Sequence, residues 1–305
     1  CGMLQHEDYL RTIQPNYDAV KAQGMIDMEE AIKKMTANQT DKGAVYTLPT
    51  VVHVVYNTAA QNLSDAQIQN MIDLLNADFR RTNSDAGNTP AAFQGVAGDM
   101  EIQFCLASTD PNGQPTTGII HKSTSTTSFS TNDNMKFDAQ GGSTAWPTDK
   151  YFNIWICNLG GGILGYGEFP TPGLSNTYGA VSHYCTVPGP SACAPYNLNR
   201  TMTHELSHCF NLYHIWGDDG GACSGSDQVA DTPNQADSRN GQCPSGVITD
   251  ACTTTSPGIQ YMNYMDYTND ACMNMFTVGQ RTRAKAAVTT YLSSVYNNTA
   301  ACSAA

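Results

Sequence analysis

Basic residues are few in this chain, and long apolar runs are absent. Lysine and arginine together number 15 in 305 residues, against 27 acidic residues, and the formal net charge is -12. Without a basic cluster no face suits phosphate groups, which argues against nucleic acid as a partner. No apolar run reaches the roughly 18 residues of a membrane span, and no signal peptide precedes Cys1. We expect a processed, soluble chain with no transmembrane segment, and the sequence favours no oligomeric state.

Cysteine, by contrast, is abundant. The chain has eleven cysteines, and an odd number leaves at least one unpaired in a monomer. Those between Cys185 and Cys272 lie mostly among glycine, serine, asparagine and proline, where buried reduced thiols are hard to accommodate. This usage favours disulfides and an oxidising compartment, so we expect a secreted, extracellular protein.

Hydrophobic patterning divides the chain. Residues 1–44 are polar and rich in methionine, with helical spacing at 25–35, and are expected to form an appendage. From residue 44 a β-branched run predicts a strand buried on both faces over 44–56. A helix over 64–81 and strands over 100–107 and 151–159 follow, which predicts a βαβ crossover and an α/β fold with a partly parallel sheet.

The second half is richer in glycine and loops. Short apolar stretches at 163–169 and 179–186 predict an edge strand and its neighbour. Residues 215–260 lack periodicity and are expected to form a loop-rich subdomain stapled by disulfides. A capping box of Thr277 and Gln280 predicts a C-terminal helix.

One segment carries a metal-binding pattern. His204 and His208 lie four residues apart, so on a helix both imidazoles face one zinc ion. Glu205 lies one residue off that face, where it can act as a general base on a metal-bound water. His214 could join them only if the chain turns sharply, and Asn211 is a residue that tolerates the left-handed conformation such a turn needs.

These residues resemble the zinc motif of the metzincin metallopeptidases, with Asn211 in place of the usual glycine. The segment 261–267 resembles the family's methionine turn, with Met265 as the methionine beneath the metal. Further likenesses at 163–166, 211–214, 231–233 and 276–280 point to the pappalysin branch. The resemblance covers most of residues 45–295.

The resemblance implies an architecture. The expected fold is an α/β (α+β) metzincin-like domain at 45–305, preceded by a pro-segment at 1–44. An upper subdomain at 45–214 would hold a twisted five-stranded mixed sheet and two long helices, including the zinc helix. A lower, loop-rich and disulfide-stapled subdomain at 215–305 would carry the methionine turn and the C-terminal helix.

It also implies a zinc-dependent endopeptidase that acts on proteins or peptides. His204, His208 and His214 would bind the zinc, whose bound water has a pKa of about 7. Glu205 would take the proton of that water and return it to the leaving amine. Tyr267 would stabilise the tetrahedral intermediate, although it could also be an ordinary half-buried aromatic residue.

Substrate recognition is expected at two places. An extended peptide could pair with the edge strand through Gly162, Leu164 and Tyr166, which could equally form a plain structural hairpin. Asp270, by resemblance, would lie at the base of the pocket for the residue after the cleaved bond and select Arg or Lys. Alternatively, Asp270 caps a turn.

Structural calcium and disulfides complete the implied set. Asp227, Val229, Asp231 and Thr232 resemble the family's calcium loop, with Asp218 and Asp219 as further oxygen donors, and the rival interpretation is a solvated acidic loop. Family spacing pairs Cys223 with Cys252 and Cys243 with Cys272, while Cys185 and Cys193 could close a short loop. Four cysteines remain unassigned, namely Cys105, Cys157, Cys209 and Cys302.

Cys1 has two interpretations. Zymogens of this branch use a Cys-Gly pair whose thiolate takes the fourth zinc position, and Cys1-Gly2 fits that role in a latent form. Alternatively, Cys1 carries a lipid anchor at the cell surface. Two rival functions also stay open: a zinc-containing binding or adhesion module with little turnover, and a zinc hydrolase for non-peptide amides. The base Glu205 argues against the first and the methionine turn against the second.

Overall fold

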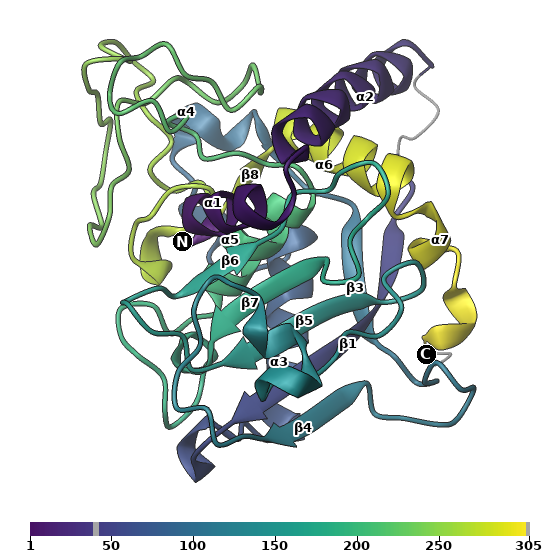
Figure 1. Ribbon diagram of the computed structural model, residues 1–305. Coiled ribbons are helices and arrows are strands. Elements are labelled where there is room, and N and C mark those ends of the chain that lie inside the picture. Colours follow the sequence, from purple (N-terminus) through teal and green to yellow (C-terminus); the bar gives the residue numbers. More distant parts are fainter. Residues whose placement is uncertain (39–42, 303–305) are drawn as a thin grey trace.

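A twisted mixed sheet forms the centre of the molecule (Figure 1). The computed structural model describes residues 1–38 and 43–302. The strand order is β3-β1-β5-β7-β6, with β4 beside β1, and only β6 runs antiparallel to its neighbour. The strands are β1 (Tyr46–Tyr56), β3 (Ile102–Leu106), β4 (Ile119–Ser123), β5 (Phe152–Cys157), β6 (Gly165–Gly167) and β7 (Gly179–His183).

The mixed sheet is confirmed, but in the described part of the chain it has six strands rather than the five expected. The additional strand is β4, which pairs with the second half of β1, while β3 pairs with the first half. Only β1 is long enough for two partners along one side. The sequence of β4 contains His121 and Lys122 and is largely solvent-accessible, so hydrophobic patterning did not reveal it.

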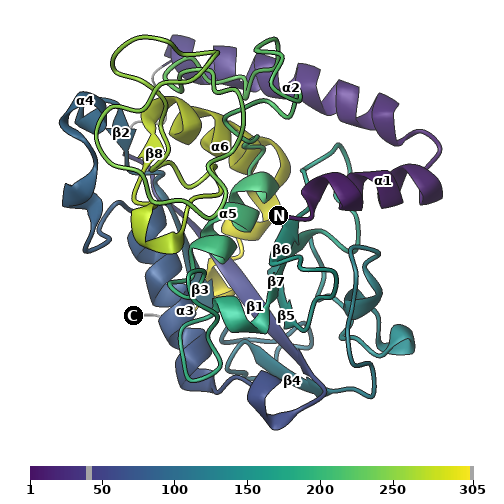
Figure 2. The same ribbon diagram turned by 90° about the vertical axis from the view of Figure 1, so that its left-hand side faces the viewer.

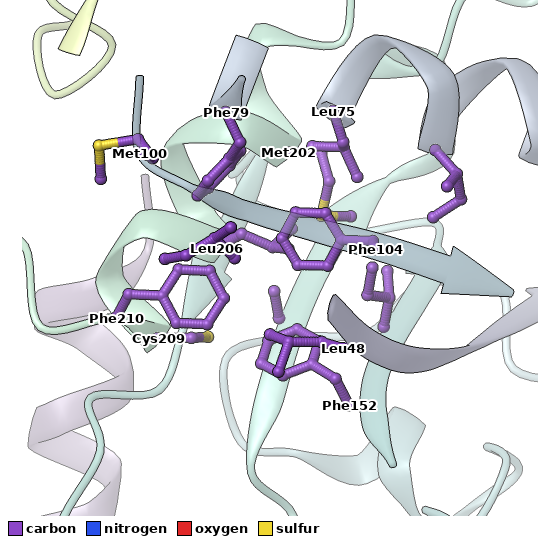
Figure 3. Packing of buried hydrophobic residues seen from close by; sticks show 14 of the residues in the cluster. Leu48, Leu75, Phe79, Met100, Phe104, Phe152, Met202, Leu206, Cys209 and Phe210 are labelled. Carbon is purple, nitrogen blue, oxygen red and sulfur yellow. The ribbon is translucent and has the colours of Figure 1, made fainter. Parts of the chain in front are cut away.

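Two helices pack against one face of the sheet. α3 (Asp65–Phe79) begins at a capping box formed by Ser64 and Gln67, and α5 (Arg200–Cys209) lies beside it. The main apolar core fills the space between these helices and the strands (Figure 3). Phe79 from α3 meets the rings of Phe104 and Phe210 at centroid distances of 5.2 and 5.8 Å.

The last third of the chain is mostly irregular, as expected. Among its few regular elements are β8 (Phe276–Thr277), which pairs with β2 (Ala97–Gly98), and the helices α6 (Val278–Tyr291) and α7 (Ser293–Tyr296). The predicted capping box at Thr277 and Gln280 starts α6. The short helix α4 (Ala91–Gln94) lies near β2 and β8 (Figure 2).

The N-terminal segment forms two helices on the outside of the domain (Figure 2). α1 (Met3–Ile13) contacts β6, and α2 (Tyr17–Asn38) lies along α6, where Met28 is buried against Ala286 and Ala287. The expected boundary near residue 44 adjoins residues 39–42, which lie outside the described part. No helix within 1–38 and 43–302 is long and apolar enough to cross a bilayer.

Candidate active site

α5 places the first two histidines of the motif on one buried face. His204 and His208 have their Nε2 atoms 3.2 Å apart. The helix begins after Asn199, whose left-handed backbone turns the chain and whose side-chain amide donates to the carbonyl of Met71. Asp270 accepts the backbone N–H groups of Leu198 at 2.7 Å and Arg200 at 3.3 Å. Hydrogen bonds to Met71 and to Asp270 therefore fix the start of the helix.

The chain then reverses at Asn211, as the motif requires. Asn211 has a φ of 64°, and the N–H of Leu212 returns to the carbonyl of Ser207. This left-handed turn ends the helix and brings His214 back, so that its Nε2 lies 3.2 Å from that of His204.

Each histidine is oriented through its other ring nitrogen. Nδ1 of His204 lies 2.6 Å from the carbonyl of Tyr264, that of His208 lies 2.8 Å from the carbonyl of Leu212, and that of His214 lies 2.8 Å from Asp218. These acceptors place the proton on Nδ1 and leave the Nε2 lone pairs pointing inward. Burial lowers the pKa of all three rings, so they are neutral ligands.

This donor set fits a zinc ion. Bonds of about 2.0 Å to a tetrahedral zinc put ligand nitrogens roughly 3.3 Å apart, close to the 3.2 Å separations in the triad. The sulfur of Cys1 lies 3.4 Å from Nε2 of His208, within reach of the same point. All four ligand atoms lie within 4.8 Å of one another.

The N-terminal residues occupy the cleft beside this cluster. Cys1 Sγ donates to Glu205 at 3.1 Å, and the N–H of Gly2 donates to the carbonyl of Gly165 at 2.6 Å. A side chain at position 2 would meet Thr131 and Ile163 at under 3 Å. Gly2 therefore makes a strand-like hydrogen bond with the edge β6 in a space too narrow for a Cβ.

Glu205 is buried between α5 and β6. Burial raises the pKa of Glu205 to about 8, against the opposing effect of the N-terminal positive charge. A Cβ at Gly165 would lie 2.7 Å from Cγ of Glu205, and one at Gly167 would clash with the Glu205 carbonyl. The two glycines allow α5 to lie directly on β6, and this contact sets the position of the Glu205 carboxyl group.

The methionine turn closes the floor of the site. Met265 and Tyr264 are fully buried, and Asn263 ties the turn to α6 through two hydrogen bonds with Gln280. Tyr267 follows the turn, and its hydroxyl lies 3.0 Å from Nε2 of His214. The phenol thus lies at the edge of the cluster.

A cavity of about 300 Å³ opens next to the histidines. Its lining includes Gly162, Leu164, Tyr267 and Asp270, so the structure brings these predicted residues together. Tyr166 is placed differently: its side chain is fully buried and its hydroxyl bonds to Asp133. Any contact of Tyr166 with a bound peptide is through its backbone.

In the predicted calcium loop, the oxygen atoms of only some of the expected residues lie close together. Asp227 accepts from the hydroxyl of Thr232 at 2.7 Å, and that hydroxyl also lies 2.8 Å from the carbonyl of Val229. Asp231 instead caps α6, where it accepts from the hydroxyl of Thr277 at 2.6 Å and the N–H of Gly279 at 2.8 Å.

Asp218 and Asp219, which precede the predicted calcium loop, contact groups outside it. Asp218 contacts Nδ1 of His214, and Asp219 accepts four backbone N–H groups at 221–225. Sequence reasoning missed the role of Asp218 at the metal cluster, and its position four residues after His214 is the only signal for it.

Four disulfides are present among the described residues. Three are the predicted pairs, Cys185–Cys193, Cys223–Cys252 and Cys243–Cys272. The fourth joins Cys105 in β3 to Cys302, a pairing that the sequence left open. Cys157 and Cys209 are free and buried, and Cys1 is free and partly accessible.

A second buried polar cluster joins α1 to the domain, and sequence reasoning missed it. His6 Nε2 lies 3.0 Å from Asp133, which also contacts Lys136 at 2.9 Å. Glu168 lies 3.7 Å from the same ammonium group. Burial would raise the pKa of Asp133, but Lys136 and His6 bring it well below its ordinary value. Because Lys136 already supplies a cation, this is an ion-pair cluster rather than a metal site.

The chain is similar to known metallopeptidases along most of its length. Residues 136–289 match the family model described as pregnancy-associated plasma protein-A, a peptidase family. An extracellular metalloprotease of Pyricularia oryzae is 31% identical over 285 residues, which cover 88% of this chain and 84% of the relative. An extracellular metalloprotease of Podospora anserina is 31% identical over 300 residues, which cover 95% of this chain and 89% of the relative.

Solved structures extend the likeness to the N-terminal helices. Mature mirolysin of Tannerella forsythia in complex with a cleaved peptide is 52% identical, with a TM-score of 0.79 over 84% of this chain and 96% of that one. A promirolysin variant of the same organism is 48% identical, with a TM-score of 0.84 over 96% and 94%.

Proposed function

The chain belongs to the pregnancy-associated plasma protein-A family of metallopeptidases, and from this premise we propose that it is a secreted zinc endopeptidase kept latent by its own N-terminal segment. The resemblance to the pappalysin branch is thereby confirmed. One observation carries the proposal beyond the family: three buried Nε2 atoms converge with separations that suit zinc, and Glu205 lies beside them.

The proposed chemistry assigns one role to each residue. Zinc, held by His204, His208 and His214, would polarise a peptide carbonyl and lower the pKa of a water molecule to about 7. Glu205 would take a proton from the water as its oxygen adds to the peptide carbonyl carbon, and would hand that proton to the amine nitrogen as the C–N bond breaks. The Tyr267 hydroxyl donates to the oxyanion as the carbonyl becomes tetrahedral.

Latency is the second part of the proposal. Residues 1–44 act as a pro-segment for a catalytic domain at 45–305, whose upper and lower subdomains meet after residue 214. Cys1 supports this because its thiol occupies the fourth donor position and contacts Glu205. The same placement favours latency over a lipid anchor, since a sulfur converted to a lipid thioether could not act as a thiolate donor to the metal.

Asp270 is the proposed selector for Arg or Lys after the cleaved bond. It is buried at the lining of the cavity, where a cationic side chain would find a desolvated carboxylate. Its hydrogen bonds to Leu198 and Arg200 hold it rigidly in place. The alternative, that Asp270 only caps a turn, is compatible with selection, because the same carboxylate can also face the cavity.

Calcium and an extracellular location remain proposals as well. Burial raises the pKa of Asp227 to about 7, which means that the buried carboxylate is costly to keep charged. A calcium ion coordinated by Asp227, Val229 and Thr232, with Asp231 nearby, would offset the cost of that charge. The relatives are named extracellular metalloproteases, and the four disulfides suit an oxidising compartment.

Mapping of cleavage products tests the proposed function. The protein freed of residues 1–44 and its Glu205→Ala variant, matched in zinc content, are incubated with a peptide mixture, and the products are sequenced by mass spectrometry. We expect cuts before Arg or Lys from the first protein and none from the variant. Cuts with another preference would overturn the Asp270 assignment alone. If the zinc-loaded protein makes no cuts, the binding-module hypothesis replaces the peptidase.

A further inference from the structure

The link between the second and third histidines contains a residue in an unfavourable conformation. Asn211 has a φ of 64°, in the left-handed region that asparagine tolerates better than most L-residues but less readily than glycine. His214 reaches the cluster only if this turn holds. Contacts that hold the backbone of Asn211 in this turn therefore help to place His214.

Arg283 of α6 supplies that stabilisation. Its Nε donates to the backbone carbonyl of Asn211 at 2.7 Å, and its Nη2 donates to the side-chain oxygen of the same residue at 3.3 Å. Its guanidinium carbon also lies 5.1 Å from the ring centroid of Tyr213. One side chain thus contacts the chain on both sides of Leu212, within the five residues that separate His208 from His214.

The environment of Arg283 is unusual for a cation. Arg283 is 4% exposed, and no carboxylate within the described residues lies at ion-pair distance from its guanidinium. Burial lowers the pKa of Arg283, and the charges of Asp227 and Glu29 offset this only from beyond ion-pair distance, so the direct contacts of the guanidinium carry weight. The contacts with Asn211 and Tyr213 are where the guanidinium makes its interactions.

α6 is a rigid base for this contact. Its first turn is held by the capping box of Thr277 and Gln280, and Asp231 accepts two further hydrogen bonds there. Gln280 also pairs with Asn263 of the methionine turn. The helix that holds the Asn211 turn therefore also holds the loop beneath the histidines.

We propose that Arg283 is a positioning residue for His214: by binding the main chain and side chain of Asn211, it allows an asparagine to make the turn for which the metzincin motif uses glycine. The proposal rests on the zinc site of the proposed function. If the proposal is correct, replacing Arg283 weakens zinc binding when residue 211 is asparagine and has little effect when residue 211 is glycine.

Zinc affinity measured by chelator competition tests this dependence. All variants carry Cys1→Ala and Glu205→Ala in the full chain, which removes the thiol donor and self-cleavage. We expect Arg283→Gln to weaken zinc binding about 10- to 100-fold, within the range for a lost hydrogen bond between a charged group and its acceptor. Asn211→Gly alone should change affinity less than about threefold, because Gly adopts the turn freely.

The double variant provides the decisive comparison. In the Asn211→Gly background, Arg283→Gln should weaken zinc binding less than about threefold, since the turn no longer needs the side-chain contact. Arg281→Gln, a neighbouring arginine on α6 paired with Glu101, is the matched control and should leave affinity unchanged. Visible spectra of the cobalt-substituted protein should show a weakened tetrahedral signature for Arg283→Gln alone.

Three outcomes would overturn the inference. Unchanged zinc affinity in a folded Arg283→Gln variant would leave Arg283 with a purely structural role. An equal loss in both backgrounds would show that Arg283 does not act through the Asn211 turn. If Arg283→Gln does not fold, Arg283→Lys is used, and wild-type affinity for it would refute the need for two-point contact. Failure of the parent to bind zinc would instead refute the proposed function.

Discussion

The His6 cluster leads to a quantitative prediction about latency. His6 is 1% exposed, its Nε2 lies 3.0 Å from Asp133, and its ring centroid lies 4.6 Å from that of Tyr166. His6→Ala removes these contacts without stranding Asp133, which keeps Lys136 at 2.9 Å and the Tyr166 hydroxyl at 2.8 Å. The cost is therefore that of a hydrogen bond to a charged group, about 1.5–3 kcal/mol.

That loss weakens the docking of α1, so the fraction of molecules with an undocked N-terminal segment should rise roughly 10- to 150-fold. Alkylation of the Cys1 thiol by iodoacetamide reports this fraction, since Cys157 and Cys209 are fully buried. The assay uses the zinc-loaded full chain with Glu205→Ala, in which self-cleavage cannot occur. We expect the rate of Cys1 alkylation to rise by the same factor.

His121→Ala is the matched control. His121 contacts Asn62 and Asp65 on an exposed surface of the domain, and its loss should not alter alkylation of Cys1. An unchanged rate for His6→Ala, or equal increases for both variants, would refute the reasoning. Docking would then depend on the other contacts of the segment, such as the packing of α2 against α6 and the hydrogen bond of Gly2 with Gly165.

Three further predictions concern the cleft. Gly165→Ala should lower both Tm and kcat, because its Cβ would lie 2.7 Å from Cγ of Glu205, while zinc content stays constant; an unchanged kcat contradicts this. Asp270→Asn should lower kcat/KM for peptides with Arg after the cleaved bond about 10- to 100-fold relative to neutral peptides. Burial raises the pKa of Asp270 to about 6 from its ordinary 3.8, so its charge is present above pH 6 and lost below. The wild-type preference for Arg should therefore fall between pH 7 and 5, and a flat ratio would refute the assignment. Zinc removal by a chelator should lower the Tm of the protein without residues 1–44, and zinc should restore it, as calorimetry can check.

Much of the fold and of the metal cluster was predictable because the underlying signals are local. Hydrophobic runs and spacing identified β1, α3 and β5, and capping residues identified the start of α6. The pair His204 and His208 is set by helical periodicity, and the need for a turn at Asn211 follows from the position of His214. The strand β4 escaped because its half-exposed residues lack the apolar pattern that packing imposes elsewhere.

Contacts between distant segments decided the rest. His204 takes its orientation from the carbonyl of Tyr264, 60 residues away. Arg283 meets Asn211 across 72 residues, and Cys105 meets Cys302 across 197. None of these partners leaves a periodic or short-range trace in the sequence.

The sequence by itself determined which residue types could bind zinc and act as a base, because helical spacing and side-chain chemistry are properties of a few consecutive residues. Only the tertiary structure decided which carbonyls and carboxylates orient the three imidazoles and how His6 anchors α1. The physical reason is that a buried polar group must find a partner, and the identity of that partner depends on which segments the folded sheet and helices bring together.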